Sequence, residues 1–437
     1  MGEAAATLTP CRLADVARPS FDRYLTRRAT APLIVAFSGG GDSLALLLGA
    51  KAWAEGAGRR LLAVTVDHRL QHAGAAWAVW CAARCARLAV EHHILDWTGD
   101  KPATGVAAAA RAARHALIAD AARAAGARVI LMGHTADDRL EAGLMRAEGG
   151  SVSEPREWAP SPIWPEGRDL FILRPLIEAR RAALREILGQ VGETWIEDPA
   201  NDDFRQPRAR ARAALTGGGE ADSAESCSGA PGLLEYVTEG ATGDLAISRD
   251  VLRQAPRDSL RALVGAVLLC VAGTARPPRG ERLGRLIARL RDEPSFVATL
   301  AGARVEAGER FVGIARETGD RRRAGAALLP LPVGAAVVWD GRFEIVARAP
   351  GLAVAALGGL ARHLDRAGRQ ALKGASPAAR PGLPALVDET GAIALPSLVA
   401  DARVTVRGLV FSRLAGALGA IQAEAAIGRV AERLATS

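Results

Sequence analysis

The sequence lacks the cysteine patterns of a disulfide-stabilised or zinc-binding protein. Its five cysteines, in 437 residues, form no CxxC pair and no cluster with histidine, so neither a disulfide framework nor a zinc site is indicated. The first 28 positions carry charged residues of both signs and no continuous apolar stretch, which argues against a signal peptide or a membrane span. We therefore expect a soluble cytoplasmic protein without a membrane partner.

Charge of one sign is in excess. Lys and Arg number 56 against 48 Asp and Glu, a net charge of +8, and nearly all of the excess is arginine. The planar guanidinium suits phosphate groups and base edges, which makes nucleic acid the first partner to consider. A coding bias that replaces lysine by arginine throughout would give the same composition, so both explanations stay open at this point.

The N-terminal part of the chain has the pattern of an α/β domain. From residue 32 to about residue 188, short buried runs alternate with longer helical stretches, as in βαβ units with a parallel sheet. The expected strands are Leu33–Phe37, Leu61–Val66, Val90–Leu95 and Val129–Met132. The expected helices are Leu44–Ala54, Ala75–Leu88, Val106–Ala124 and Asp138–Met145.

Two breaks divide the rest of the chain. Residues 216–232 are rich in Gly and Ser, as flexible linkers are, and residues 317–325 contain three consecutive arginines. Between them we expect helices at Asp250–Cys270 and Glu281–Arg291 and strands at Phe296–Leu300 and Phe311–Ile314. After the second break we expect a mainly β module with strand Val337–Ala347, a β-turn at Trp339–Phe343 and a closing helix near Ala420–Leu434. The predicted domains are residues 1–215, 233–318 and 326–437, the last two being smaller α+β domains.

A glycine-rich segment follows the first expected strand and precedes the first expected helix. It reads Ser38-Gly39-Gly40-Gly41-Asp42-Ser43. Its backbone N–H groups lie where unpaired helix donors and the helix dipole favour an anion. Ser38 and Ser43 add hydroxyl donors, and Asp42 can hold Mg²⁺ beside phosphate. A simple glycine turn would need neither the serines nor the aspartate.

This hexapeptide resembles the SGGxDS loop of the PP-loop ATP pyrophosphatases and lacks the Gly-Lys-Ser/Thr ending of a Walker loop. Members of that superfamily, whose domain is adenine nucleotide α-hydrolase-like, cleave ATP to AMP and pyrophosphate. Further segments narrow the resemblance to the tRNA(Ile)-lysidine synthase family. They are Val66-Asp67-His68, the segment from Gly133 to Ala142, Arg174-Pro175-Leu176, and the segment from Trp195 to Asn201.

The resemblance implies a set of acidic site residues. Asp138 and Glu141 are three residues apart and share one face of a helix that begins at the edge of the sheet where the phosphate loop lies. We assign Asp42, Asp138 and Glu141 to catalysis, Asp42 and Asp137 to Mg²⁺, and the six loop residues with His134 to ATP. An acidic first helical turn that only complements the dipole is the alternative for the carboxylates. The family pattern is altered at Thr135, Arg139 and Ala142, none of which removes a carboxylate.

Arginines are the expected tRNA contacts. Arg111 and Arg114 match the family's Arg-x-x-Arg element, and the dense run after residue 204 matches its next basic element, with Ala209 in place of asparagine. In the middle module, arginines recur at helical spacing and form one basic stripe. Solvated helix faces would also explain these patterns. The residues that we assign to tRNA are Arg111, Arg114, Arg208, Arg210, Arg212, Arg282 and Arg285.

The resemblance implies ATP-dependent ligation of L-lysine to the wobble cytidine of the isoleucine tRNA with a CAU anticodon, through an adenylated cytidine. ATP and Mg²⁺ would be required, and a homodimer is one assembly that we consider. The main alternative is a tRNA thiolation enzyme of the same superfamily, although such enzymes usually carry CxxC pairs, whereas Cys81 and Cys85 are spaced CxxxC. A non-catalytic basic tRNA-binding protein is a second alternative, which the loop and its carboxylates argue against.

Overall fold

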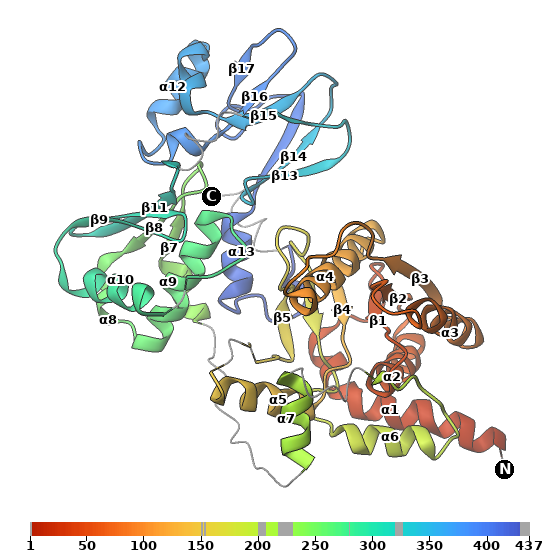
Figure 1. The fold of residues 1–437 in the computed structure, drawn as a ribbon. Coiled ribbons are helices and arrows are strands. Elements are labelled where there is room, and N and C mark those ends of the chain that lie inside the picture. Colours follow the sequence, from red (N-terminus) through yellow and green to blue (C-terminus); the bar gives the residue numbers. More distant parts are fainter. Residues whose placement is uncertain are drawn as a thin grey trace. The chain divides into compact units, whose positions relative to one another are not determined.

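The computed structural model describes residues 2–149, 152, 154–199, 207–216, 230–278, 280–319 and 327–428 (Figure 1). The chain forms two compact units. The first contains residues 1–226 and 421–429, and the second contains residues 227–420 and 430–437. Within the described ranges, no helix combines the length and apolar character needed to cross a membrane.

The first unit is built on a six-stranded sheet with the order β3-β2-β1-β4-β6-β5. All neighbouring strands are parallel except β5, which pairs antiparallel with β6 at one edge. The predicted α/β fold with an N-terminal parallel sheet is thereby confirmed. The strands are β1 (Leu33–Ala36), β2 (Leu61–Asp67), β3 (Glu91–Asp96), β4 (Val129–Leu131), β5 (Trp158–Pro160) and β6 (Phe171–Leu173).

Helices connect these strands. The four predicted helices are confirmed as α2 to α5, with ends that differ from prediction by at most a few residues, whereas α1, α6 and α7 were not predicted. The helices are α1 (Gly2–Tyr24), α2 (Gly41–Ala57), α3 (Gly74–Arg87), α4 (Val106–Ala124), α5 (Ala136–Ala147), α6 (Arg181–Gly189) and α7 (Pro207–Thr216).

Helix α2 is apolar on nearly all sides. Leu44, Leu46 and Leu47 are fully buried, because α2 packs on β1 and β2 and is covered by α1 and α6. A helix surrounded in this way cannot present one polar face to solvent. The packing therefore fixes the start of α2, and with it the glycine-rich loop.

Strand order sets the position of the site. From β1 the chain continues to β2 and β3 on one side, while β4 and β6 lie on the other side of β1. Ligands of open parallel sheets bind where strand order reverses, beyond the carboxyl ends of the strands. Here that point lies between the loops that follow β1 and β4.

The second unit begins with a five-stranded sheet of order β7-β8-β11-β10-β9. Its neighbouring strands are antiparallel. Its strands are β7 (Val237–Glu239), β8 (Leu245–Ser248), β9 (Phe296–Leu300), β10 (Ala303–Ala307) and β11 (Phe311–Arg316). Helices and 3₁₀ turns accompany it: η2 (Pro231–Tyr236), α8 (Arg249–Gln254), α9 (Arg257–Ala272) and α10 (Gly280–Asp292).

Two small sheets follow, with the orders β12-β15-β16-β17 and β13-β14-β18. Their strands are β12 (Leu329–Pro330), β13 (Ala336–Trp339), β14 (Phe343–Ala347), β15 (Ala353–Ala356), β16 (Pro384–Val387), β17 (Ile393–Ala394) and β18 (Val404–Gly408). The helical segments are η3 (Gly358–His363), α12 (Arg366–Lys373), η4 (Arg380–Gly382), α13 (Val410–Ala417) and, in the first unit, η5 (Glu424–Ala426).

Three expectations for this part of the chain need correction. The single helix 250–270 is two helices, because Pro256 cannot continue the hydrogen-bonding pattern of α8. The strand 337–347 is a hairpin, whose turn at Asp340 and Gly341 has positive φ at both positions and confirms the predicted β-turn. The closing helix 420–434 is wrong in its described part, where only the short η5 lies. Residues 429–437 lie outside the described residues, as do residues 217–229 and 320–325 of the two predicted breaks.

The helix α13 packs into the core of the five-stranded sheet. Val410, Leu414 and Leu418 belong to the same buried cluster as Leu268 of α9. Residues from the middle and the last predicted domains thus share one core. The division into residues 233–318 and 326–437 stays a prediction.

The segment 421–428 returns to the first unit. Glu424 is buried there and forms a bidentate ion pair with Arg59, with both N–O distances at 2.9 Å. The Thr26 N–H also donates to Glu424, and Arg128 donates to the Ile427 carbonyl. Arg59 lies two residues before β2, and Arg128 directly precedes β4. This segment therefore lies at the edge of the sheet opposite to the phosphate loop.

Candidate active site

Hydrogen bonds of its own serines stabilise the glycine-rich loop. Ser43 Oγ accepts a hydrogen bond from the Ser38 N–H at 3.2 Å and donates one to the Gly40 carbonyl at 2.9 Å. Gly39 has φ of +82°, a conformation that a residue with a side chain rarely adopts. The six residues follow β1 as predicted, but only Ser38 to Gly40 precede the helix, because α2 begins at Gly41 and includes Asp42 and Ser43.

The start of α2 is left open for an anion. Its N-cap residue, Gly40, offers no side-chain capping bond, and the first N–H groups of a helix have no partner within it. The loop after β4 lies against this turn, since a Cβ on Gly133 would be 2.9 Å from the Asp42 carbonyl oxygen. The segments predicted to bind ATP and cations are therefore neighbours.

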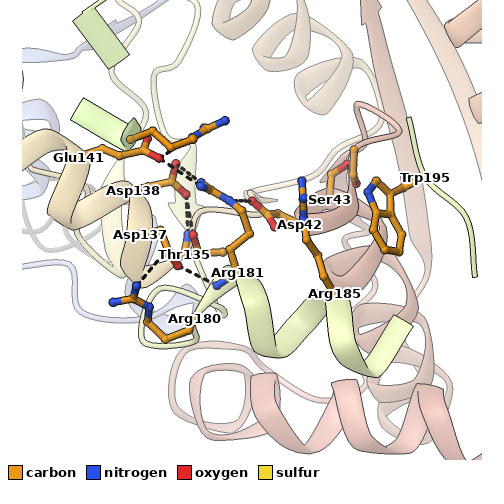
Figure 2. A network of polar contacts seen from close by, with 12 residues as sticks. Asp42, Ser43, Thr135, Asp137, Asp138, Glu141, Arg180, Arg181, Arg185 and Trp195 are labelled. Carbon is orange, nitrogen blue, oxygen red and sulfur yellow. Dashed lines mark hydrogen bonds and ion pairs between the residues drawn. The ribbon is translucent and has the colours of Figure 1, made fainter. Parts of the chain in front are cut away.

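Four carboxylates lie at this edge of the sheet, and each is paired with arginine (Figure 2). Arg181, the first residue of α6, joins three of them: its Nε lies 2.9 Å from Asp42, its Nη1 3.1 Å from Glu141 and its Nη2 3.4 Å from Asp138. The fourth, Asp137, accepts the Arg181 N–H at 2.7 Å and pairs with Arg180 at 3.1 Å.

Helix α7 adds further guanidinium groups to this cluster. Arg208 contacts Asp138 and lies 2.7 Å from Glu141 through its Nε, and Arg212 lies 3.0 Å from Glu141. Glu141 is buried, and charges removed from water persist only when they are paired. Arg208 and Arg212, assigned to tRNA from the sequence, thus lie on the acidic cluster, while Arg210 is exposed on the same helix.

Asp138 has a second contact, with the start of its own helix. Its Oδ2 accepts hydrogen bonds from the Thr135 N–H at 2.7 Å and from the Thr135 hydroxyl at 3.1 Å. This capping arrangement gives Asp138 a structural role besides its predicted catalytic role. It also explains how threonine is accommodated where the family pattern has a second histidine.

Asp42 is the carboxylate most suited to a metal ion. Burial raises its pKa, the pair with Arg181 opposes that rise, and nearby Asp138 adds to it. Its Oδ1 is buried and has no hydrogen-bond partner among the described residues. An unpaired buried carboxylate oxygen beside a phosphate site is what Mg²⁺ requires, since this ion takes one or two carboxylates together with phosphate and water oxygens. Among the described residues, no group of three or more His, Cys, Asp or Glu side chains is arranged to hold a metal ion.

A basic cluster lies beside the acidic one. Arg174 donates from its Nε to His134 Nδ1 at 2.8 Å, and burial followed by the Arg174 charge lowers the pKa of His134 well below its ordinary value. Burial, then repulsion from Arg111 and Arg208, lowers the pKa of Arg114 to about 10. Such mutual repulsion is relieved by an anion. His134 thus accepts a hydrogen bond from Arg174, while its predicted contact with ATP stays a prediction.

The segment after α6 lies against the phosphate loop. The Ile196 N–H donates to the Gly39 carbonyl at 3.0 Å. A Cβ on Gly41 would be 3.5 Å from both the Trp195 ring and Arg185 Nε. The segment that begins at Trp195, one of those that carry the family resemblance, is therefore part of the site.

Sequence reasoning did not identify Arg181 and Arg185 as site residues. They are four residues apart at the start of α6, which begins five residues after Leu176 of the Arg174-Pro175-Leu176 motif. Their helical spacing beside a recognised motif was the available signal.

The two arginines predicted in the middle module belong to the second unit. Arg282, Arg285 and Arg289 of α10 line a groove of about 580 Å³ together with the turn between β9 and β10. Arg285 pairs with Glu281, and Arg289 pairs with Glu293 and stacks on Phe296. The predicted basic stripe is thus present on α10; Arg279, which would extend it, lies outside the described residues.

Comparison with known proteins finds relatives that match most of the chain. A family model described as a PP-loop domain matches residues 14–217. A tRNA(Ile)-lysidine synthase of Caulobacter vibrioides is 48% identical over 94% of this chain and 98% of its own length, and one of Hyphomonas neptunium is 35% identical over 71% and 85%. A solved structure of the U34-tRNA thiolase NcsA from Methanococcus maripaludis covers 48% of this chain and 73% of its own, with a TM-score of 0.39 and 14% identity.

The PP-loop match covers the unit that holds the glycine-rich loop, and the match to the Caulobacter protein extends along almost the whole of both chains. The chain belongs to the tRNA(Ile)-lysidine synthase family.

Proposed function

We propose that the protein joins L-lysine to the wobble cytidine of the isoleucine tRNA with a CAU anticodon, using ATP and releasing AMP and pyrophosphate. The observation that carries the proposal is the open start of α2 next to the paired carboxylates Asp42, Asp138 and Glu141. An anion site and a cation site at one sheet edge suit a reaction between a nucleotide phosphate and an amine.

In the first step, the cytidine O2 attacks the α-phosphorus of ATP, and the bond to the pyrophosphate oxygen breaks. Residues 38–43 hold the phosphates, and Asp42 would hold Mg²⁺ through its buried Oδ1. Bound there, Mg²⁺ neutralises phosphate charge. Asp137 would serve the ion only after it releases Arg180, so its more immediate role is to position α6 through the Arg181 N–H.

In the second step, the lysine ε-amine attacks C2 of the cytidine, the C2–O bond breaks, and AMP leaves with that oxygen. We propose that Asp138 and Glu141 bind the ε-ammonium and accept its proton. Because both carboxylates contact Arg208, and Glu141 also Arg212, lysine has to exchange with a guanidinium at this point.

The tRNA would contact three groups of arginines. Arg111 and Arg114 belong to the basic cluster beside the loop, Arg208, Arg210 and Arg212 lie on α7, and Arg282 and Arg285 lie on α10. Repulsion from Arg111 and Arg208 acts on Arg114, and Arg210, Arg282 and Arg285 are exposed, all of which favours a polyanion as partner. We place the enzyme in the cytoplasm, and a homodimer stays a prediction.

Thiolation is the weaker function for this site. Burial raises the pKa of Cys81 to about 11 and that of Cys85 to about 12. Sulfur transfer needs an accessible thiolate, so these two thiols are inert core groups.

The function is tested by incubating the protein with purified isoleucine tRNA, ATP and labelled L-lysine and by locating the label in the anticodon nucleoside. Asp42→Asn should reduce lysine incorporation to less than about a tenth, because the variant loses the proposed Mg²⁺ ligand, while tRNA binding is retained. Asp15→Asn, at an exposed position of α1, is the control. More than a tenth of wild-type activity in Asp42→Asn would remove the magnesium role, and sulfur incorporation without lysine would favour thiolation.

A further inference from the structure

Two arginines of α6 face the phosphate loop from successive helical turns. Arg181 and Arg185 are four residues apart, which places them on one face of the helix, and α6 packs on α2. Figure 2 shows Asp42 between them, with Arg181 on the side of Asp138 and Glu141 and Arg185 on the side of Trp195.

The two guanidinium groups differ in how fully they are neutralised. Arg181 contacts three carboxylates; although burial lowers its pKa, the bond to Asp42 and the nearby negative charges raise it overall. Arg185 contacts Glu197 at 3.2 Å, but that glutamate is 63% exposed, and exposed pairs of this kind are weak. Arg181 is committed to its carboxylates, whereas Arg185 retains charge for a ligand.

Arg185 also has an unused donor at the loop. Its Nε is buried without a hydrogen-bond partner among the described residues. The same atom is 3.5 Å from the Cβ position of Gly41, the first residue of α2. A buried donor without an acceptor is unfavourable, and next to the open start of a helix the acceptor that fits is an anion.

Trp195 holds this guanidinium in place. The Arg185 Cζ lies 5.6 Å from the centre of the indole ring, and Trp195 Nε1 donates to Glu197 at 2.6 Å. Arginine stacked on an aromatic ring keeps its planar fork oriented. Trp195 and Glu197 are therefore positioning residues for Arg185.

The position of Arg185 relative to Asp42 indicates which phosphates of ATP it binds. Under the proposed function, the α-phosphorus reacts with the base, and the carboxylates that serve the amine lie on the Arg181 side of Asp42. The β- and γ-phosphates then extend to the other side, where Arg185 lies. We propose that Arg185 binds the β- and γ-phosphates of ATP and neutralises the pyrophosphate that departs with the electron pair of the broken P–O bond. This assignment rests on the proposed function for its direction along ATP.

The test compares ligands that differ only in these phosphates. Full-length wild-type protein and Arg185→Gln are titrated with ATP, AMP and pyrophosphate in the presence of Mg²⁺ and without tRNA or lysine. We expect the dissociation constants of ATP and pyrophosphate to rise by about 10- to 100-fold, as for loss of a charge-assisted hydrogen bond, and that of AMP to change by less than about twofold.

Three further variants sharpen the comparison. Arg185→Lys keeps the charge without the fork and should fall between wild type and Arg185→Gln. Trp195→Leu should weaken pyrophosphate binding less than Arg185→Gln does. Arg60→Gln, an exposed arginine paired with Glu91 at the opposite edge of the sheet, should match wild type.

Equal weakening of ATP and AMP, or an unchanged pyrophosphate constant, would overturn the assignment. If Arg185→Gln does not fold, the test rests on Arg185→Lys. A dissociation constant for pyrophosphate equal to that of wild type in this variant would then contradict the assignment. Failure of the proposed function looks different: wild type would bind pyrophosphate through Arg185 yet incorporate no lysine into tRNA.

Discussion

At the scale of single residues, the site is a balance of opposite charges. Asp42, Asp137, Asp138 and Glu141 face arginines that Figure 2 shows converging on them, with Arg181 at the centre. Each buried charge is stable because its partner is present. A cationic substrate or a metal ion entering this site therefore exchanges with an existing partner.

The buried histidines make stability depend on pH. Burial, and then the charges of Arg114 and Arg111, lower the pKa of His115 from 6.5 to about 3. Between these values the unfolded chain binds a proton at this position and the folded chain does not. Stability should thus fall as pH decreases below 6.5, by about 1.4 kcal/mol per pH unit for one such histidine.

Urea denaturation between pH 7 and 5 checks this expectation. His115→Gln should flatten the dependence, because glutamine does not titrate, whereas His93→Gln, at an exposed position on β3, should leave it unchanged. An identical slope in wild type and His115→Gln would show that His115 is not the titrating group. His134 acts in the same direction, so a reduced slope should remain in His115→Gln.

At the scale of elements, the sequence predicted those parts that are specified locally. The Gly39 to Gly41 loop, the four strands from β1 to β4 and the Ala-rich α4 follow from short patterns. β5 and β6 were missed because three-residue strands give too short a signal, and α6, of nine residues, was not predicted and its Arg181 and Arg185 were not singled out. The pairing of Arg208 with Glu141 could not be predicted, since the two residues belong to different helices and lie 67 positions apart along the chain.

The start of α5 couples helix stability to the site. Thr135 donates to Asp138 from both its N–H and its hydroxyl. Thr135→Ala removes the hydroxyl and should lower the free energy of unfolding by about 1 kcal/mol, the usual cost of losing a capping side chain. Chemical denaturation measures the change, and Thr135→Ser should restore most of it; a serine variant as unstable as alanine would mean that the methyl group, not the hydroxyl, matters.

Helix α7 has an unusual attachment for a surface helix. Arg208 and Arg212 bind it to α5 through Asp138 and Glu141. Two of the residues proposed for tRNA, Arg208 and Arg212, therefore form ion pairs with the carboxylates proposed for lysine. Phosphate groups that attract α7 would at the same time free the carboxylates for an amine.

At the scale of the whole molecule, the first unit is completed by a distant segment. The Glu424 side chain is 6% exposed, and its partner Arg59 is fully buried. Glu424→Gln leaves that guanidinium uncompensated and should destabilise the first unit by about 3 kcal/mol.

Denaturant unfolding followed by a probe in the first unit measures the loss. Glu91→Gln is the matched control, because its pair with Arg60 is exposed and should contribute less than about 1 kcal/mol. Equal stability of Glu424→Gln and Glu91→Gln would show that the segment 421–428 contacts the first unit without stabilising it.

The return of residues 421–428 also has a consequence for synthesis on the ribosome. Arg59 is made early, yet its carboxylate partner is translated 365 residues later. Until then Arg59 lacks its counterion in the nascent first unit, so the folding of this unit is not finished when its own sheet is complete. A chain whose translation stops before residue 424 would keep this defect and be the better substrate for proteases, which makes the ion pair a check on the length of the chain.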